Sequence, residues 1–348
     1  MTTAQKRSAA YSHRFIDQLQ PGETLEDAVF MISQKDLRTT TSGSLYIHMV
    51  FADRSGQLLA RVWQATQAQF DQIADGGFLR IRGRVESYKG TLQVIVDAMQ
   101  AVAPNQIDVG DYLPRTRHDI EDMWQRVLSV LRTIKSPELL KLIKAFVQDE
   151  TIVTGFKKAP AAIQNHHAYI GGLLEHTCSL LELATRIFGK QDDSDSHYPE
   201  VSRDLVLAGI FLHDIGKTAE LTYDTNFAYS TEGQLVGHIT QAAIWIDRKI
   251  REVERESEEP FPPDLRNLLI HIVLSHHGQY EFGSPKLPAC LEAFVVHYLD
   301  NIDAKLNIGF AAIDGAKDGE SDWTSYIRSL ETRFFKKDVM GCRSAPSE

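Results

Sequence analysis

The period of the hydrophobic pattern changes once along this 348-residue chain, near Pro104. Before that point apolar and polar residues alternate, as in "SLYIHMVFADRSG" and "FLRIRGRVESYKG". From about residue 119 onwards, apolar residues recur instead at the helical spacing of three and four. A chain that switches period in this way is expected to be a multidomain protein, with an all-β domain followed by an all-α domain.

The first part, residues 13–105, predicts a small barrel. About five strand-like segments are separated by glycines, and a short polar helical stretch, "ATQAQFDQIADGG", lies between the third and the fourth. This order favours an OB barrel, although any small antiparallel barrel or sandwich would show similar alternation. Residues 1–12 are expected to form a flexible N-terminus.

The second part predicts helices throughout. We expect a linker with connecting helices over 106–158, a helical bundle over 159–335 and a C-terminal tail over 336–348. A break is expected at Ser136-Pro137, because proline ends a helix that precedes it.

Charge and composition narrow the classes of protein. The net charge of −10 argues against a protein that coats nucleic acid by bulk charge, and the excess of acidic residues falls after residue 105. No apolar run approaches the roughly 20 residues of a membrane span, and the N-terminus lacks the apolar core of a secretory signal. Three scattered cysteines do not form a disulfide framework. We therefore expect a cytoplasmic location and no membrane partner.

Ten of the thirteen histidines lie between His166 and His297. The helical segments of this region each carry a residue that can bind metal, namely His176, His213-Asp214, His238, His276-His277 and Asp300. Neutral imidazole and carboxylate are common ligands of Mn, Fe and Zn ions. Inward-pointing ligands on several helices are how bundles build metal sites, so this series predicts a metal centre.

The order of these residues resembles a known superfamily. The segments "LLEHT", "FLHDIGK" and "VHYLDNIDAK" are similar to the His…His-Asp…Asp pattern of HD-domain metal-dependent phosphohydrolases. The additional "VGHIT" and "LSHHG" resemble members that bind two or more metals. With "NHHAYIGGLLEHT" and an N-terminal OB domain, the chain resembles the YhaM-type 3′→5′ exoribonuclease family from about residue 14 to 335.

This resemblance implies the ligands of two divalent metal ions. The core ligands would be His176, His213, Asp214 and Asp300, and those of a second ion would include His238 and His276. Mn²⁺ is the favoured metal, with Fe, Zn or Co as alternatives. Metal ions acidify bound water and neutralise phosphate oxygens, which suits phosphodiester hydrolysis.

Three further residues are candidates for contact with the substrate. Lys217, three residues after Asp214, would steady the scissile phosphate or protonate the leaving oxygen, unless it is a solvated surface lysine. His277 would act on the phosphate or bind metal, so Lys217, Asp214 and His277 form the expected catalytic set. His167 is expected to contact the substrate, whereas His297 is expected to be structural.

Aromatic and basic side chains of the barrel are candidates for binding a single strand. We expect substrate contacts from Tyr46, Trp63, Arg80, Arg82 and Tyr88. The wider set of candidates adds His48, Phe51, Arg38, Arg61, Arg84 and Lys89. Phe51 and Trp63 would instead fill the barrel if they point inwards.

These observations lead to one main functional prediction and two alternatives. The main prediction is a metal-dependent 3′→5′ exoribonuclease that hydrolyses single-stranded RNA, with single-stranded DNA as a second substrate, to nucleoside monophosphates. The direction of cleavage follows from the resemblance alone. The alternatives are a phosphohydrolase of small or cyclic nucleotides, and a non-catalytic nucleic-acid-binding factor with a structural metal site. "HDIGKTAE" lacks the acidic pair of guanosine-tetraphosphate hydrolases, and no "GYP" motif follows His277. Whether the protein forms a homo-oligomer is left open.

Overall fold

The computed structural model describes residues 13–88, 91–163, 167–189, 196–223, 227–316 and 321–342. The expected flexible N-terminus, residues 1–12, and the end of the expected tail, residues 343–348, lie outside the described residues. The chain divides into two compact units, one up to Arg115 and the other from Thr116 onwards apart from the short segment 223–227.

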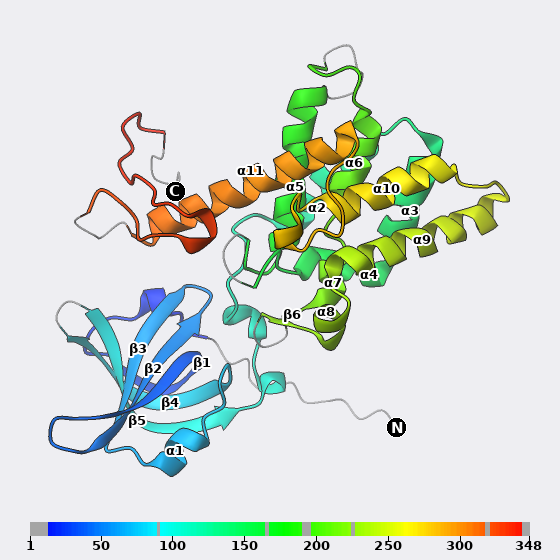
Figure 1. Cartoon of the computed structure of the whole chain (residues 1–348). Coiled ribbons are helices and arrows are strands. Elements are labelled where there is room, and N and C mark those ends of the chain that lie inside the picture. Colours follow the sequence, from blue (N-terminus) through cyan, green and yellow to red (C-terminus); the bar gives the residue numbers. More distant parts are fainter. Residues whose placement is uncertain are drawn as a thin grey trace, which may run out of the picture. The chain divides into compact units, whose positions relative to one another are not determined.

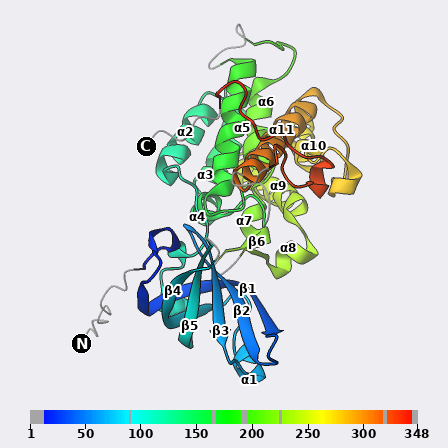
Figure 2. The ribbon, with the colours of Figure 1, turned by 90° about the vertical axis from the view of Figure 1, so that its left-hand side faces the viewer.

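The first unit is a closed five-stranded barrel (Figures 1 and 2). Its strands are β1 (Thr24–Thr39), β2 (Leu45–Asp53), β3 (Gly56–Trp63), β4 (Phe78–Tyr88) and β5 (Thr91–Val102). They follow the order β1-β2-β3-β5-β4, and β4 pairs with β1 to close the barrel. Only β3 and β5 pair in parallel among these strands, and the short helix α1 (Gln67–Asp71) lies between β3 and β4. This is the strand order of an OB barrel, so the predicted fold is confirmed.

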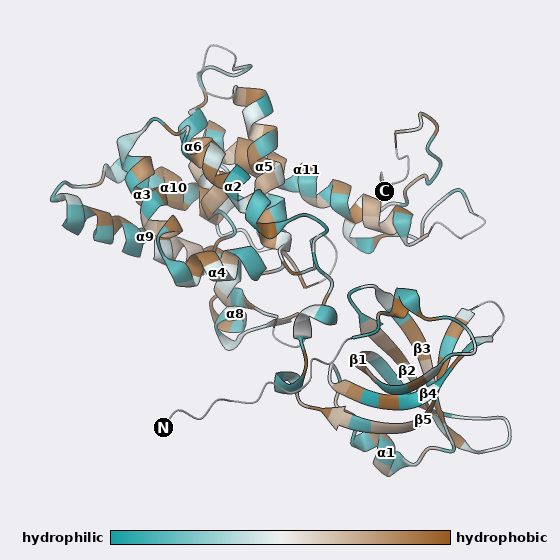
Figure 3. Cartoon of the chain, turned by 180° about the vertical axis from the view of Figure 1, so that it is seen from behind, coloured by the Kyte–Doolittle hydropathy of each residue, from teal (hydrophilic) through white to brown (hydrophobic). Residues whose placement is uncertain are grey.

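The alternation of the sequence places one side chain in two inside the barrel (Figure 3). Phe30 and Phe51 stack there with ring centroids 5.3 Å apart, beside the buried Ile47 and Met49. Phe51 therefore fills the barrel and is not available to a ligand, whereas Trp63 is on the surface. Tyr112, beyond the last strand, packs on the barrel in a smaller buried cluster.

The second unit is helical. Its longer helices are α2 (Ile120–Leu131), α3 (Pro137–Val147), α4 (Glu150–Lys158), α5 (Gly172–Phe188), α6 (Arg203–Leu212), α9 (His238–Ser257), α10 (Pro263–Ser275) and α11 (Leu291–Asp314). Shorter elements are α7 (Lys217–Glu220), α8 (Thr231–Leu235) and the hairpin of β6 (Leu221–Thr222) and β7 (Ala228–Tyr229). Single turns of 3₁₀ helix lie at Ile16–Gln18, Pro104–Gln106, Val109–Asp111, Tyr280–Phe282 and Arg328–Leu330.

Side-chain caps decide where several helices begin. The side chains of Asp119, Ser136, Asp149 and Ser202 each accept a hydrogen bond from the backbone at the start of the following helix. Ser136 therefore separates α2 from α3 at the expected break. No helix of the described residues is both long enough and apolar enough to cross a membrane.

The centre of the helical unit is α6, whose residues from Leu205 to Leu212 are all buried or nearly so. α5, α10 and α11 pack against it. Residues at the end of α6 and on the facing sides of its neighbours are therefore held inside the bundle, which is where the predicted metal-binding residues lie.

Candidate metal centre and barrel surface

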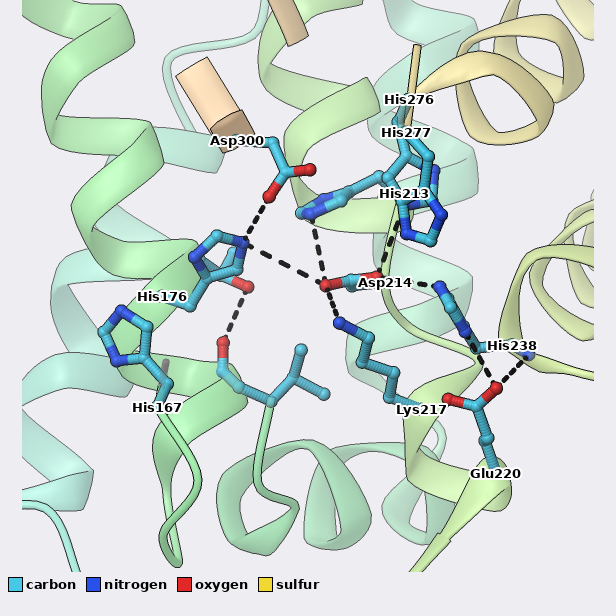
Figure 4. Close-up of polar contacts among 12 residues, drawn as sticks. His167, His176, His213, Asp214, Lys217, Glu220, His238, His276, His277 and Asp300 are labelled. Carbon is cyan, nitrogen blue, oxygen red and sulfur yellow. Dashed lines mark hydrogen bonds and ion pairs between the residues drawn. The ribbon is translucent and has the colours of Figure 1, made fainter. Parts of the chain in front are cut away.

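The predicted metal-binding residues come from five separate segments and converge on Asp214 (Figure 4). His176 projects from α5 and Asp300 from α11, while His213 ends α6 and Asp214 follows it. His238 begins α9, and His276 ends α10. Gly216 makes this convergence feasible, because a Cβ there would lie 2.1 Å from the carbonyl oxygen of His238.

The two carboxylate oxygens of Asp214 face different histidines. Its Oδ2 lies 3.4 Å from Nε2 of His213 and 4.0 Å from Nε2 of His176. Its Oδ1 lies 3.4 Å from Nε2 of His238 and 3.5 Å from Nε2 of His276. Asp300 adds a second carboxylate on the Oδ2 side, 3.2 Å from Nε2 of His176. The geometry is that of a carboxylate bridging two neighbouring cation sites.

Hydrogen bonds fix which nitrogen of each imidazole points at Asp214. The Nδ1 atoms of His213 and His276 donate to the carbonyl oxygens of Ile210 and Val273, both at 2.7 Å. Nδ1 of His238 donates to Glu220 at 2.9 Å. Because carbonyl and carboxylate oxygens only accept here, the proton is on Nδ1, and Nε2 presents its lone pair.

The donor atoms left over fit a divalent metal. Nε2 of His213, His238 and His276 and Oδ1 of Asp214 are buried and have no hydrogen-bond partner among the described residues. A buried polar atom without a partner costs free energy unless something binds it. Two groups of three residues with suitably close ligand atoms fall on opposite sides of the centre, His176-His213-Asp214 and His238-His276-His277.

The ionisation states suit cation binding. Burial lowers the pKa of His276, and it lowers the pKa of His277 to about 3, so both rings are neutral near pH 7. Burial also disfavours a charged His176, but hydrogen bonds to Asp300 and Asp303 raise its pKa to about 9. A cation shared by His176 and Asp300 would replace the proton that this pair otherwise holds.

Lys217 is part of the centre. Its Nζ donates to Oδ2 of Asp214 at 2.7 Å, and the side chain is buried, so it is not a solvated surface lysine. Burial opposes its charge, but the adjacent Asp214 carboxylate raises the pKa of Lys217 above its ordinary value. The centre therefore holds a fixed positive charge that binds no metal.

Asp303 and His167 support the centre from behind. Oδ2 of Asp303 accepts from Nδ1 of His176 at 2.8 Å and from Nε2 of His167 at 2.9 Å. His167 is buried, hydrogen-bonds Tyr169 through Nδ1, and does not line the cavity described next. The structure thus places it where it orients Asp303, at a distance from the substrate contact expected from the sequence.

A cavity of about 690 Å³ opens onto the centre. Asp214, Lys217, His238, His277 and Asp300 contribute to its lining. The rest of the lining is largely apolar and includes Tyr229, Phe282, His297, Ile308 and Leu330. A polar substrate group can therefore reach the metal-binding residues while an apolar portion rests against the remaining surface.

Comparisons with known proteins agree with this architecture. The HD-domain family model matches residues 173–305. The chain is 33% identical over 316 residues to the 3′-5′ exoribonuclease YhaM of Bacillus pumilus, which covers 89% of this chain and 94% of that protein. The chain belongs to the YhaM-type 3′→5′ exoribonuclease family. The resemblance inferred from the sequence is confirmed, and an HD domain implies dependence on divalent metal.

The barrel of this family member is also similar to solved OB domains. One is the second OB-fold domain of replication protein A from Methanococcus maripaludis, at 17% identity over 26% of this chain and 95% of that one, with a TM-score of 0.20. Another is an OB domain from Thermoplasma acidophilum, at 16% identity over 30% and 95% of the two chains, with a TM-score of 0.21.

The barrel surface brings three of its predicted residues together. Tyr46 and Trp63 pair across β2 and β3 with ring centroids 5.1 Å apart. The guanidinium of Arg61 lies 5.6 Å from the Trp63 ring and 5.7 Å from the Tyr88 ring. We call Tyr46, Trp63, Tyr88 and Arg61 the aromatic cluster. Burial, with Arg38 and Arg61 nearby, lowers the pKa of His48, which marks positive potential around it.

The other predicted basic residues do not join the aromatic cluster. Arg80 and Arg82 lie six to eight residues before Tyr88 on β4, which corresponds to roughly 20–26 Å along a strand. Arg80 also pairs with Asp27 at 3.3 Å. Lys89 lies outside the described residues.

Sequence reasoning missed several residues of the centre in this family member. Glu220 accepts from both the backbone and the side chain of His238, and no spacing pattern pointed to it. His297 lines the cavity and donates to the carbonyl of His276 at 2.7 Å, so it does more than fill the core. Tyr229 and Phe282 come from short loop-like segments that carry no motif.

Proposed function

We propose that this protein is a metal-dependent 3′→5′ exoribonuclease that shortens single-stranded RNA and releases nucleoside monophosphates. The observation that carries the proposal is the Asp214 carboxylate, which faces two pairs of histidine Nε2 atoms at the wall of the cavity. The direction of cleavage rests on family membership.

The proposed centre holds two divalent cations. His176, His213, Asp214 and Asp300 would hold one of them, while His238, His276 and the second oxygen of Asp214 would hold the other. Mn²⁺ is favoured over Fe, Zn and Co because the donors are imidazoles and carboxylates without thiolate. Bound cations of this kind acidify water and neutralise phosphate oxygens.

Two further side chains would act on the phosphate. Lys217 keeps its proton at neutral pH and lines the cavity, so it can stabilise charge on the scissile phosphate or donate a proton to the leaving oxygen. His277 donates through Nδ1 to the carbonyl of Phe282 at 2.7 Å, which leaves Nε2 of a neutral ring to accept a proton or bind metal.

The cavity would receive the 3′-terminal nucleotide. Its volume of about 690 Å³ lies within the range of small-ligand pockets. Tyr229 and Phe282 are each more than half exposed, and stacking on such rings accepts any base. An exonuclease needs this tolerance, since each cycle presents a new terminal base.

The aromatic cluster of the barrel would hold the strand further from its end. Three aromatic rings with one guanidinium suit base stacking and backbone contact. Arg80 and Arg82 would contact phosphates on another part of the barrel surface. Because stacking does not distinguish sugars, single-stranded DNA is a second proposed ligand. A cytoplasmic location and homo-oligomer formation stay predictions.

The test is incubation of the full-length protein with 5′-labelled single-stranded RNA, in Mn²⁺ and in EDTA. The proposal predicts a ladder that shortens from the 3′ end with release of nucleoside 5′-monophosphates in Mn²⁺, and an intact strand in EDTA. An intact strand in Mn²⁺ together with hydrolysis of small or cyclic nucleotides would favour a nucleotide phosphohydrolase. RNA binding without turnover of any substrate would favour a binding factor with a structural metal.

A further inference from the structure

Helix α11 carries a continuous row of exposed apolar side chains. The row, which we call the α11 stripe, consists of Leu291, Phe294, Tyr298, Ile302, Leu306 and Phe310. Its spacing of three and then four residues keeps all six on one face of the helix. Their exposed fractions range from 46% at Phe294 to 64% at Tyr298, although large apolar side chains are normally buried.

The opposite face of α11 is already occupied. Ala293, Val296 and Leu299 are buried, and α11 packs against α5, α6 and α10. Figure 1 shows α11 as a long helix whose C-terminal half extends past α5. A helix that is apolar on both sides is normally buried on both sides, so the α11 stripe lacks a cover in the described part of the chain.

Charge is almost absent from the stripe. Between Leu291 and Ala304 the ionisable side chains are Glu292, His297, Asp300 and Asp303. Of these, His297 and Asp303 are buried and Asp300 faces the metal centre. Contiguous apolar patches of this kind mark interaction sites on soluble proteins.

The barrel of the same chain offers little that would match the stripe. Among its described residues, Trp63 and Tyr88 are the exposed large hydrophobic side chains. Both flank Arg61 in the aromatic cluster and are isolated from other apolar surface. A second copy of α11, by contrast, brings six apolar side chains with the same spacing. An apolar row of this kind is its own complement, as a two-fold interface requires.

We propose that the α11 stripe is the interface of a homodimer, in which α11 packs against α11 of a second copy across a two-fold axis. The two helices run antiparallel, which also sets their dipoles in opposition. The proposal does not depend on the proposed function, because it concerns assembly in the absence of substrate.

The available area agrees with a stable dimer. A helix of 24 residues is roughly 36 Å long. Fully buried aromatic side chains cover about 150–250 Å² each, so six half-exposed apolar side chains contribute on the order of 500–600 Å². With the polar rim on either side, this approaches the roughly 800 Å² per partner of a standard interface.

The test is sedimentation of the full-length protein over a range of concentrations. We expect the wild type to sediment as two chains of 39.2 kDa each. Phe294→Glu and Leu306→Glu, placed near the two ends of the stripe and away from the metal-binding residues, each put a charge into the interface. Each should weaken association at least ~30-fold and give single chains.

Ile244→Glu is the matched control. Ile244 is 51% exposed on α9, outside the stripe, so this variant should remain dimeric. Circular dichroism checks that each variant is folded. A wild type that sediments as a single chain at every concentration would overturn the proposal, and this is also the outcome if the barrel covers the stripe. Assembly that survives both stripe substitutions would overturn it as well.

Discussion

Asp214 is the residue on which the centre depends, because its two oxygens face separate pairs of imidazoles. Asp214→Asn should therefore lower metal-dependent turnover roughly 100-fold or more, since a neutral amide is a poor metal ligand. The measurement is RNA hydrolysis at saturating Mn²⁺, with Asp264→Asn on the exposed start of α10 as a control. RNA binding through the barrel should be unchanged. A folded Asp214→Asn protein with full activity would rule out the proposed centre.

Lys217 differs from its neighbours because it contributes charge without binding metal. Lys217→Ala should lower kcat by about 10²–10³ while leaving metal content unchanged, because it removes a cation beside the scissile phosphate. Metal analysis and steady-state kinetics on the same preparation separate these two effects. Lys141→Ala, which removes a half-exposed lysine paired with Glu259, is the control. An unchanged kcat would mean that Lys217 only neutralises Asp214.

At the scale of elements, the surface of strands β2, β3 and β4 carries the aromatic cluster. Trp63→Ala should weaken binding of single-stranded RNA by about 5–150-fold, which corresponds to roughly 1–3 kcal/mol of stacking per base. Hydrolysis of a dinucleotide, too short to reach the barrel, should not change. Trp323→Ala, at an exposed tryptophan of the C-terminal segment, is the control in a fluorescence anisotropy titration. Equal losses in the two variants would contradict a specific role for the cluster.

The β2–β3 turn is held by a buried carboxylate, that of Asp53. It accepts hydrogen bonds from His13, the backbone of Ile16, and Ser55. Burial opposes its ionisation, but these hydrogen bonds outweigh burial and hold the pKa of Asp53 below its ordinary value of 3.8.

A depressed pKa makes Asp53 stabilising above about pH 4 and less so as the pH falls through the lower pKa of the folded state. Asp53→Asn should therefore destabilise the barrel at pH 7, and its difference from the wild type should shrink towards pH 3. Urea unfolding of both proteins across this range measures the difference. A difference that is constant with pH would assign the effect to shape and not to charge.

The sequence predicted the two folds of the molecule because each depends on a local period. Strand alternation and the helix between the third and fourth strands identified the barrel, and the series of histidines and aspartates on successive helices identified the centre. Glu220, His297 and Phe282 were not predicted, because their roles arise from contacts with residues distant in sequence. The packing of Tyr112 on the barrel was hidden for the same reason, since the segment after Pro104 reads as a polar linker.

For the whole molecule, the central claim is that Asp214 bridges two cations at the wall of the cavity. The most direct measurement is anomalous diffraction from crystals of the full-length protein grown with Mn²⁺. The account predicts two peaks, one near Nε2 of His176 and His213 and the other near Nε2 of His238 and His276, about 3.5–4 Å apart. A single peak away from Asp214, for example between His167 and Asp303, or no peak at saturating Mn²⁺, would contradict it.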